Sequence, residues 1–279
     1  MNLNSIYIWF LILFIVLVFV SVAITFINNR LVPDETITDE NYKNVSQRIP
    51  KILHKVHLTT NNDTSISNPI RNAQESWSKM NPGYEIKYWN MQSCENYLKN
   101  NFPPVYLETF QRINSFAGKC NFFRYCIVFQ EGGWYSDWKQ VCLKRNILKK
   151  LSFDKTFVYF QDKGCKFTIE NKCIQNAFFG AVPNHPVLKE VIHNAIENTR
   201  IKYYGKHALD TTGVCLFGKT IRNSVHPTNS SGKFQSNFFH HNSYGVIVQH
   251  KCDLCPKGQT WKNGNNYNTL WTKRMYYSR

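Results

Sequence analysis

Polar residues with chemically useful side chains gather between Lys119 and Lys139, in the stretch KCNFFRYCIVFQEGGWYSDWK. Asn121 and Arg124 are three residues apart, which on a helix brings both side chains to one face and a common site. Asp137 supplies a carboxylate after this pair, and Lys139 supplies an ammonium group two residues later. An amide that hydrogen-bonds and several cations suit a site that binds an anion.

The local pattern predicts the elements that position these residues. Apolar residues recur at steps of four and three and predict a helix with one buried face: Phe116, Cys120, Phe123 and Ile127. Gly132 and Gly133 end this helix, because glycine adopts a positive φ at little cost. Trp134 and Tyr135 favour an extended strand. Asp137 then emerges at the carboxyl end of that strand, where open α/β sheets bind their ligands.

The rest of the chain predicts further strands and helices, and therefore an α/β fold. An apolar run at residues 49–57 predicts a buried parallel strand that carries His54, and residues 156–161 predict a strand that ends at Asp162. Helices are expected after Pro69 and after Pro186, with short helices broken by Pro103 and Pro104 between residues 93 and 113.

Asp162 and Asp210 are candidate reactive carboxylates, because acidic residues are scarce in this half of the chain. Each suits a general base, a nucleophile or an acceptor of sugar hydroxyls. For each residue the capping of a turn is an open alternative.

The central stretch resembles the core of the DXD-containing glycosyltransferases grouped with the yeast initiating mannosyltransferase. Their pattern is R-A-D-x-x-R-Y, seven residues, then G-G-x-Y-x-D-x-D. The matching positions are Arg124, Tyr125, Gly132, Gly133, Tyr135 and Asp137. The departures are Lys119, Cys120 and Asn121, in place of Arg, Ala and Asp, and Lys139, in place of the second Asp. Residues 49–57 also resemble the family's opening strand, I-P-K-I-I-H-Q-x-W.

The resemblance implies a glycosyltransferase A-type, Rossmann-like sheet flanked by helices. It also implies transfer of a sugar from a nucleotide-diphosphate donor to a glycan or glycolipid hydroxyl, with retention of the anomeric configuration. By resemblance, the donor-binding residues are His54, Lys119, Asn121, Arg124, Tyr135 and Asp137. The expected catalytic residues are Asp137, Lys139 and Asp162.

Mn²⁺ or Mg²⁺ at Asp137 is the cofactor that the resemblance implies, because the family's carboxylates hold a metal against the diphosphate. Lys139 replaces the second carboxylate, and two interpretations stay open. The ammonium group does part of the metal's work, since the leaving oxygens need nearby positive charge from any source. Alternatively, Lys139 points into solvent, and the protein either is inactive or holds a metal through other ligands.

The N-terminal part of the chain predicts a membrane anchor. Residues 6–27 contain no charged side chain and are long enough to cross a bilayer core of roughly 30 Å as one helix. We therefore expect a short tail (1–5), a transmembrane helix (6–27), a stem (28–48) and a catalytic domain (49–279). The family resemblance places that domain in the lumen of the Golgi or another secretory compartment.

The net charge of +16 invites a nucleic-acid or membrane-surface interpretation, but no arginine-rich helix or aromatic RNA-binding motif accompanies it, and we expect no nucleic-acid partner. A compositional bias towards Lys and Asn explains the charge, and an adaptation to anionic donors or acceptors is the open alternative. The rival hypothesis from another class is an inactive, membrane-anchored protein that binds nucleotide sugars or glycans.

Nine cysteines suggest disulfides, and Cys165 with Cys173 is the first pair expected. Cys252 and Cys255 beside His250 have the spacing of half a zinc site, although a local disulfide or two buried thiols also fit.

Overall fold

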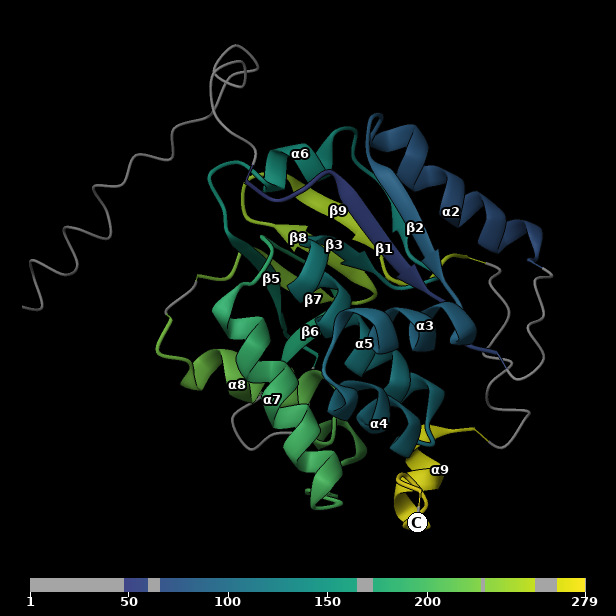
Figure 1. Cartoon of the computed structure of the whole chain (residues 1–279). Helices are drawn as coiled ribbons and strands as arrows, with labels where there is room; N and C mark the ends of the chain where they lie inside the picture. The colour runs from purple at the N-terminus through teal and green to yellow at the C-terminus, as the bar shows by residue number, and fades with distance from the viewer. Residues whose placement is uncertain (1–47, 60–65, 165–172, 227–228, 254–264, 279) are drawn as a thin grey trace, which may run out of the picture. The chain divides into compact units, whose positions relative to one another are not determined.

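The computed structural model describes residues 48–59, 66–164, 173–226, 229–253 and 265–278. The elements are β1 (Ile52–Val56), α2 (Asn68–Met80), β2 (Glu85–Trp89), α3 (Met91–Asn101), α4 (Pro104–Arg112), α5 (Phe116–Glu131), β3 (Gly133–Ser136), β4 (Val141–Cys142), α6 (Ile147–Leu151), β5 (Phe157–Asp162), β6 (Ile174–Ala181), α7 (Pro186–Arg200), η2 (Ala208–Asp210), α8 (Val214–Asn223), β7 (Gly232–Gln235), β8 (Phe238–His241), β9 (Gly245–Gln249) and α9 (Tyr267–Thr272). The predicted α/β class is confirmed (Figure 1).

The predicted membrane helix, residues 6–27, lies outside the described residues, as do the tail and all of the stem except its last residue. Among the helices that the structure describes, none is long and apolar enough to span a bilayer.

A mixed sheet organises the fold, with strand order β2-β1-β3-β6-β5-β7-β8-β9-β4. β1 pairs in parallel with both β2 and β3, as the buried opening strand predicts. β6 runs antiparallel between β3 and β5. β7 pairs in parallel with β5. The pairs β7–β8, β8–β9 and β9–β4 are antiparallel, and the last of them places β9 beside residues 141–142.

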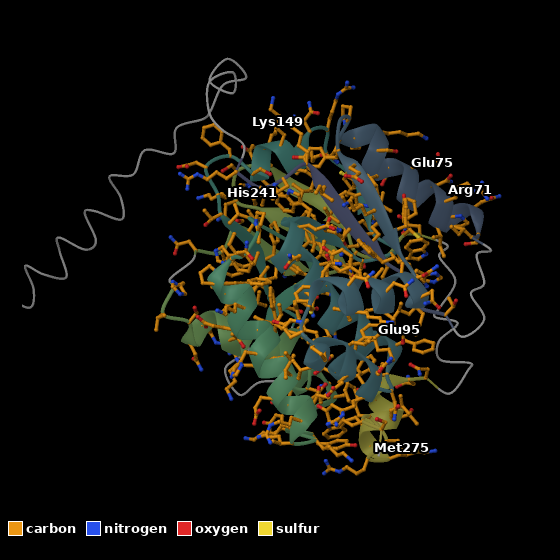
Figure 2. All side chains as sticks on the ribbon, in the orientation of Figure 1. Arg71, Glu75, Glu95, Lys149, His241 and Met275 are labelled. Atoms are coloured by element: carbon orange, nitrogen blue, oxygen red, sulfur yellow. The ribbon has the colours of Figure 1, made fainter. Side chains whose placement is uncertain are left out.

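Helices cover both faces of the sheet. One hydrophobic cluster lies between the sheet and the helices α3, α4, α5, α7 and α8 (Figure 1). A second cluster lies on the other face, where it includes residues of α2, α6, β8 and β9. Consecutive strand residues point to opposite faces, so Trp134 joins the α2 side and Tyr135 joins the α5 side. The outer face of α2 carries the exposed Arg71 and Glu75 (Figure 2).

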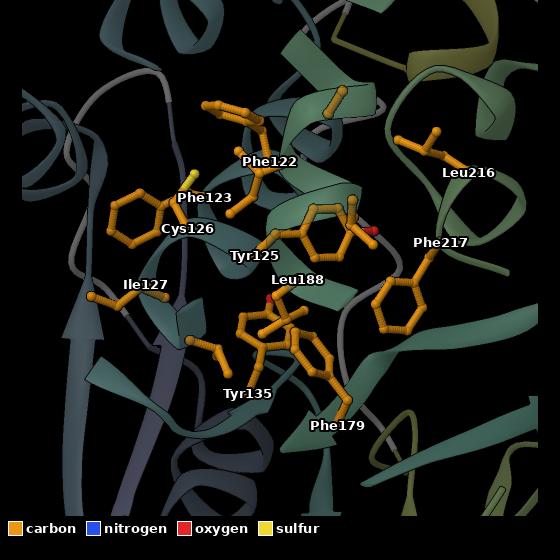
Figure 3. Close-up of a cluster of buried hydrophobic side chains, with 14 of the residues drawn as sticks. Phe122, Phe123, Tyr125, Cys126, Ile127, Tyr135, Phe179, Leu188, Leu216 and Phe217 are labelled. Carbon is orange, nitrogen blue, oxygen red and sulfur yellow. The ribbon is translucent and has the colours of Figure 1, made fainter. Parts of the chain in front are cut away.

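The helix α5 carries three of the predicted site residues, Lys119, Asn121 and Arg124. Its buried residues extend beyond the single predicted stripe, because Phe122, Tyr125 and Cys126 are as fully buried as Phe123 and Ile127 (Figure 3). A helix that is apolar on most sides belongs in a core. Here α7, α4 and the sheet surround it, which fixes the direction of every side chain that it presents.

The predicted change from helix to strand at the glycine pair is confirmed. Gly132 has φ +69° and Gly133 has φ +88°, the region that glycine adopts most easily. A Cβ on Gly133 would lie 2.6 Å from the Ile52 carbonyl oxygen, and one on Gly132 would lie 2.6 Å from Pro183 Cδ. The two glycines therefore let β3 start directly against β1.

Two details of the expected elements change. The helix α2 begins at Asn68, so its N-cap is Ser67 and Pro69 lies in its first turn. Cys252 is disulfide-bonded, and a cysteine in a disulfide cannot offer zinc a thiolate, so the half zinc site is excluded. Cys173 is also disulfide-bonded, whereas Cys165 and Cys255 lie outside the described residues.

Candidate active site

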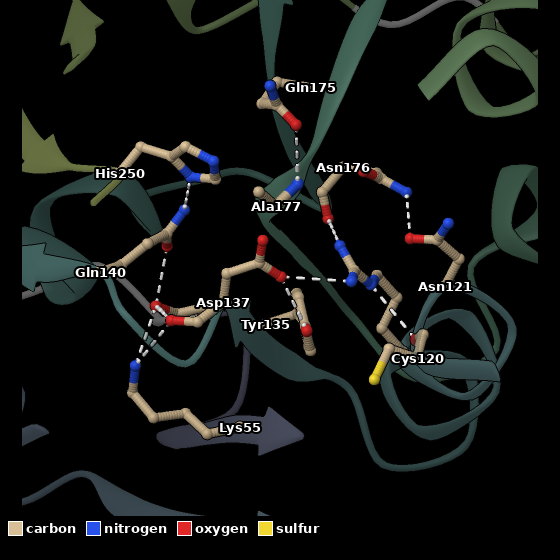
Figure 4. Close-up of polar contacts among 12 residues, drawn as sticks. Lys55, Cys120, Asn121, Tyr135, Asp137, Gln140, Gln175, Asn176, Ala177 and His250 are labelled. Atoms are coloured by element: carbon tan, nitrogen blue, oxygen red, sulfur yellow. Dashed lines mark hydrogen bonds and ion pairs between the residues drawn. The ribbon is translucent and has the colours of Figure 1, made fainter. Parts of the chain in front are cut away.

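The centre of the candidate site is Asp137, directly after β3. Its backbone N–H still donates to the Ala177 carbonyl of β6 at 2.9 Å, so the sheet fixes its position. The carboxylate oxygen Oδ1 lies 3.1 Å from Arg124 Nη2 and accepts a hydrogen bond of 2.9 Å from the Tyr135 hydroxyl (Figure 4). The Asp137 side chain is 31% exposed, whereas that of Arg124 is 6% exposed. The carboxylate is thus accessible to a ligand while its orienting partner is not.

Arg124 is held on every side of its guanidinium. Nη1 donates to the Asn176 carbonyl at 2.8 Å, Nε donates to the Cys120 carbonyl at 3.2 Å, and Cζ lies 4.2 Å from the centre of the Tyr135 ring. Burial alone lowers the pKa of Arg124, but Tyr135 and Asp137 outweigh it and leave the pKa above its ordinary value. Arg124 is therefore a permanent, fixed cation.

Asn121 joins the same site through Asn176. The Asn176 side-chain amide donates to Asn121 Oδ1 at 3.1 Å, and the backbone carbonyl of Asn176 accepts from Arg124 (Figure 4). The same amide also donates to the Tyr125 hydroxyl at 2.6 Å. Tyr125 in turn donates to the Thr212 carbonyl at 2.9 Å. The structure thus brings Asn121, Arg124, Tyr135 and Asp137 together.

Lys55 is a residue of this site that the sequence reasoning did not single out. Its side chain lies on the α2 side of β1, fully buried, with Nζ 3.1 Å from Ser136 Oγ and 3.3 Å from the Asp137 carbonyl oxygen. The ammonium also lies 4.9 Å from the centre of the Trp77 ring. Burial lowers the pKa of Lys55 to about 7, and the nearby Asp137 partly offsets this. The position of Lys55 inside the apolar run at residues 49–57 was the sequence feature that could have predicted its role.

A turn from Asp137 to Gln140 carries Lys139. Gln140 N–H donates to the Asp137 carbonyl at 3.1 Å, the same oxygen that Lys55 reaches. The Lys139 carbonyl accepts from Cys252 N–H at 3.0 Å, so the turn lies against the segment that follows β9. Burial lowers the pKa of Lys139, and the positive charge of Lys251 lowers it further.

His54 and Lys119 point elsewhere. His54 accepts from Trp89 Nε1 at 3.3 Å and makes a 3.0 Å hydrogen bond to the Gly132 carbonyl, so it ties β1 to β2 and to the glycine pair. Burial lowers its pKa to about 4. The Lys119 ammonium donates to carbonyls at the end of α4, those of Phe110 and Gln111, where a cation is favourable. Burial lowers the pKa of Lys119 to about 8.

Asp162 and Asp210 act in turns. Asp162 ends β5, two strands from β3, and accepts from Gly164 N–H at 3.0 Å and from Gln175 Nε2 at 3.2 Å. Asp210 Oδ2 accepts from the backbone N–H groups of residues 206 and 207, at 2.8 and 2.9 Å. Asp210 also lines a groove of about 630 Å³ between α7 and α8, whose lining contains no residue of the Asp137 cluster.

The residues around Asp137 do not fit a divalent metal. Mn²⁺ and Mg²⁺ need several oxygen ligands, but one oxygen of Asp137 already accepts two hydrogen bonds, and the next position of the motif is Lys139. Among the residues that the structure describes, no three His, Cys, Asp or Glu side chains converge as a set of metal ligands.

A family model matches this chain across the Asp137 region, and relatives match larger parts of the chain. The family described as "Glycosyltransferase sugar-binding region containing DXD motif" matches residues 67–158, which include Arg124, Tyr135 and Asp137. An uncharacterized glycosyltransferase of Acanthamoeba polyphaga mimivirus is 30% identical over 194 residues, which cover 69% of this chain and 73% of that protein.

Two yeast relatives are more distant. The inositol phosphoceramide mannosyltransferase 2 of Schizosaccharomyces pombe is 26% identical, with coverage of 54% of this chain and 40% of that protein. A mannosyl phosphorylinositol ceramide synthase of Saccharomyces cerevisiae is 24% identical, with coverage of 64% and 42%. The chain thus spans less than half the length of these two yeast relatives.

Among solved structures, the UDP-bound glycosyltransferase domain of the YGT toxin has a TM-score of 0.47 at 8% identity, with coverage of 67% of this chain and 80% of that one. The extent of the mimivirus match and the family match across the Asp137 region lead to one conclusion: this chain belongs to the glycosyltransferase family whose sugar-binding region contains a DXD motif.

Proposed function

We propose that this protein transfers a sugar from a nucleotide-diphosphate sugar to a hydroxyl of a glycan or glycolipid, with retention of the anomeric configuration. The observation that carries the proposal is the Arg124–Asp137–Tyr135 cluster at the carboxyl end of β3. Ligands of open α/β sheets bind at that edge, and family membership supplies the class of reaction.

Each residue of the cluster has a separate task in this proposal. Arg124 and Tyr135 both engage Oδ1 of Asp137, which fixes the carboxylate and leaves its other oxygen to accept hydrogen bonds from hydroxyls of the donor sugar. Asn121, held by Asn176, offers a further polar contact one helical turn from Arg124. A sugar fixed in this way presents its anomeric carbon to the acceptor in a constant orientation.

The acceptor in this proposal is a glycolipid at a membrane surface. Support comes from the yeast relatives, whose names identify them as enzymes that mannosylate inositol phosphoceramide, and from the net charge of +16, which attracts anionic headgroups. We further propose that residues 6–27 anchor the chain and residues 28–48 form a stem, which leaves residues 49–279 as the catalytic domain in the lumen of the Golgi or a related compartment. The uncharged stretch supports the anchor, and the lumenal location rests on the family resemblance.

The test is turnover by the full chain, purified in a mild detergent, with a panel of nucleotide sugars and inositol-containing lipids. We expect release of the nucleoside diphosphate with one donor, and a fall of roughly 100-fold or more in kcat for Asp137→Asn, the size that loss of a key polar group causes. Asp154→Asn is the matched control, because Asp154 is exposed and its ion pair, with Arg48 across 3.5 Å, lies at the surface.

Two results would contradict the proposal. Unchanged turnover in Asp137→Asn would remove Asp137 from the site. Binding of a nucleotide sugar without turnover by the folded wild type, with any donor and acceptor, would support the binding-protein alternative. The configuration of the anomeric proton in the first product, followed by NMR, tests retention separately.

A further inference from the structure

We propose that Lys139 and Lys251 bind the diphosphate of the donor directly, with Lys55 as a buried cation behind them, so that the site works without a divalent metal ion. This inference rests on the proposed function and names the groups that hold the donor's anionic part. It follows from where three lysines lie relative to the turn that carries Asp137.

The first step is the contact between two distant parts of the chain. The Lys139 carbonyl accepts from Cys252 N–H at 3.0 Å, and Gln140 Nε2 lies 3.1 Å from His250 Nδ1. These two contacts align the turn with residues 250–252. Lys251 directly precedes Cys252 and so lies beside the Lys139 turn, where its positive charge lowers the pKa of Lys139.

The second step is that the Lys251 segment is fixed. The backbone N–H of Lys251 donates to Asn237 Oδ1 at 3.0 Å, and Asn237 Nδ2 donates to the Lys251 carbonyl at 3.1 Å. Cys252 is disulfide-bonded. The Lys251 side chain is exposed and that of Lys139 is half-buried, so both can meet a ligand. Two positive charges held on neighbouring segments repel each other, and a bound anion offsets that repulsion because it attracts both.

The third step is the charge behind the turn. Lys55 reaches the Asp137 carbonyl from the α2 side, and Arg124 reaches the Asp137 carboxylate from the α5 side. Asp137 is therefore surrounded by cations of the protein itself. A diphosphate gains from the charge of Arg124 and, below the pKa of about 7 that burial gives Lys55, from that of Lys55 as well, whereas a divalent cation would be repelled by them.

The motif itself supports the inference. A D-x-D motif carries two carboxylates, and here the chain reads Asp137-Trp138-Lys139, with an ammonium group in place of the second one. The exchange of a carboxylate for an ammonium group changes the local charge by two, as much as a divalent ion brings. The departing diphosphate then meets fixed ammonium groups, which stabilise developing negative charge as a metal does.

The experiment is calorimetric binding of inorganic pyrophosphate, UDP and GDP to the full chain, with EDTA or with Mn²⁺. Pyrophosphate reports on the diphosphate subsite whatever base the donor carries. We expect binding in EDTA, weakened roughly 10-fold by Lys139→Ala and again by Lys251→Ala, as for a lost hydrogen bond to a charged group. Lys99→Ala is the control, because it removes the same charge from an exposed position of α3.

Lys139→Asp is the most discriminating variant, since it rebuilds the two carboxylates of the motif. We expect it to lose binding in EDTA and to bind nucleotide only with Mn²⁺. Wild-type binding that requires Mn²⁺, or alanine variants that bind pyrophosphate as tightly as the wild type in EDTA, would overturn the inference.

Turnover separates this inference from the function on which it rests. Sugar transfer that occurs only with Mn²⁺ would leave the proposed function intact and reject the metal-free site. Absence of turnover with every donor, while pyrophosphate still binds through Lys139 and Lys251, would reject the proposed function and retain the anion site.

Discussion

The buried ammonium of Lys55 makes the folding stability depend on pH. Burial lowers the pKa of Lys55 from 10.5 to about 7. Below pH 7 the group is protonated in both the folded and the unfolded chain. Between about pH 7 and 10.5 the unfolded chain keeps a proton that the folded chain releases. Because the unfolded state then binds more protons, the free energy of unfolding rises with pH across this window.

The size of the effect follows from the pKa difference. Each pH unit inside the window adds about 1.4 kcal/mol to the free energy of unfolding, so the step from pH 7 to pH 8.5 adds about 2 kcal/mol. At higher pH, buried thiols act in the opposite direction. Burial raises the pKa of Cys120 to about 12, so its unfolded form loses a proton first and stability falls. The comparison is therefore restricted to pH 6 to 8.5.

The assay is urea unfolding of the wild type, Lys55→Met and the control Lys99→Met. Methionine fills a similar volume without charge, so the difference between wild type and Lys55→Met isolates the titration of one group. We expect Lys55→Met to gain about 2 kcal/mol less than the wild type between pH 7 and pH 8.5, and Lys99→Met to follow the wild type. Parallel pH profiles for wild type and Lys55→Met would refute the assigned titration.

Two further predictions test the joint before β3 and the orientation of Asp137. Gly133→Ala should destabilise the fold by at least about 1 kcal/mol more than Gly83→Ala, as thermal unfolding would measure, because both have a positive φ but only Gly133 faces a backbone atom at 2.6 Å. Equal losses would show that β3 does not pack as tightly on β1. Tyr135→Phe should lower kcat/KM roughly 10-fold, since it removes one hydrogen bond to Asp137. Tyr203→Phe, at an exposed position, is the control and should leave kcat/KM unchanged. An unchanged kcat/KM in Tyr135→Phe would show that this hydrogen bond does not orient Asp137 for the reaction.

The elements around the site could be predicted because their signals are local. The apolar period of α5 and the glycine pair after it follow from backbone sterics, and so does the start of β3. The strands β7, β8 and β9 had no comparable signal. β8 reads Phe-Phe-His-His and buries only Phe239. The pairing of β8 depends on β7 and β9, and this pairing places Lys251, which follows β9, beside the turn that carries Lys139.

The direction of single side chains was harder to predict than the elements. His54 and Lys55 are neighbours on β1 and therefore point to opposite faces of the sheet. His54 contacts the Gly132 carbonyl, and Lys55 is the residue that reaches the Asp137 turn. Lys119 is two residues from Asn121, a spacing that puts two helical side chains on different sides. Arg124, three residues from Asn121, shares its side, and the structure brings those two together through Asn176.

The buried Lys55 is better explained by ligand binding than by a contribution to the stability of the fold. The resemblance to the family's opening strand places a glutamine at this position, and a glutamine amide can also donate hydrogen bonds to a hydroxyl and a carbonyl. The lysine makes these same contacts, yet it adds a buried charge that lowers stability. Hydrogen bonding alone therefore does not account for it. A cation behind the turn has a use when the ligand in front is an anion, and Lys139 at the second position of the D-x-D motif changes the charge in the same direction. A residue that costs stability at a binding site is what a stability–function compromise predicts.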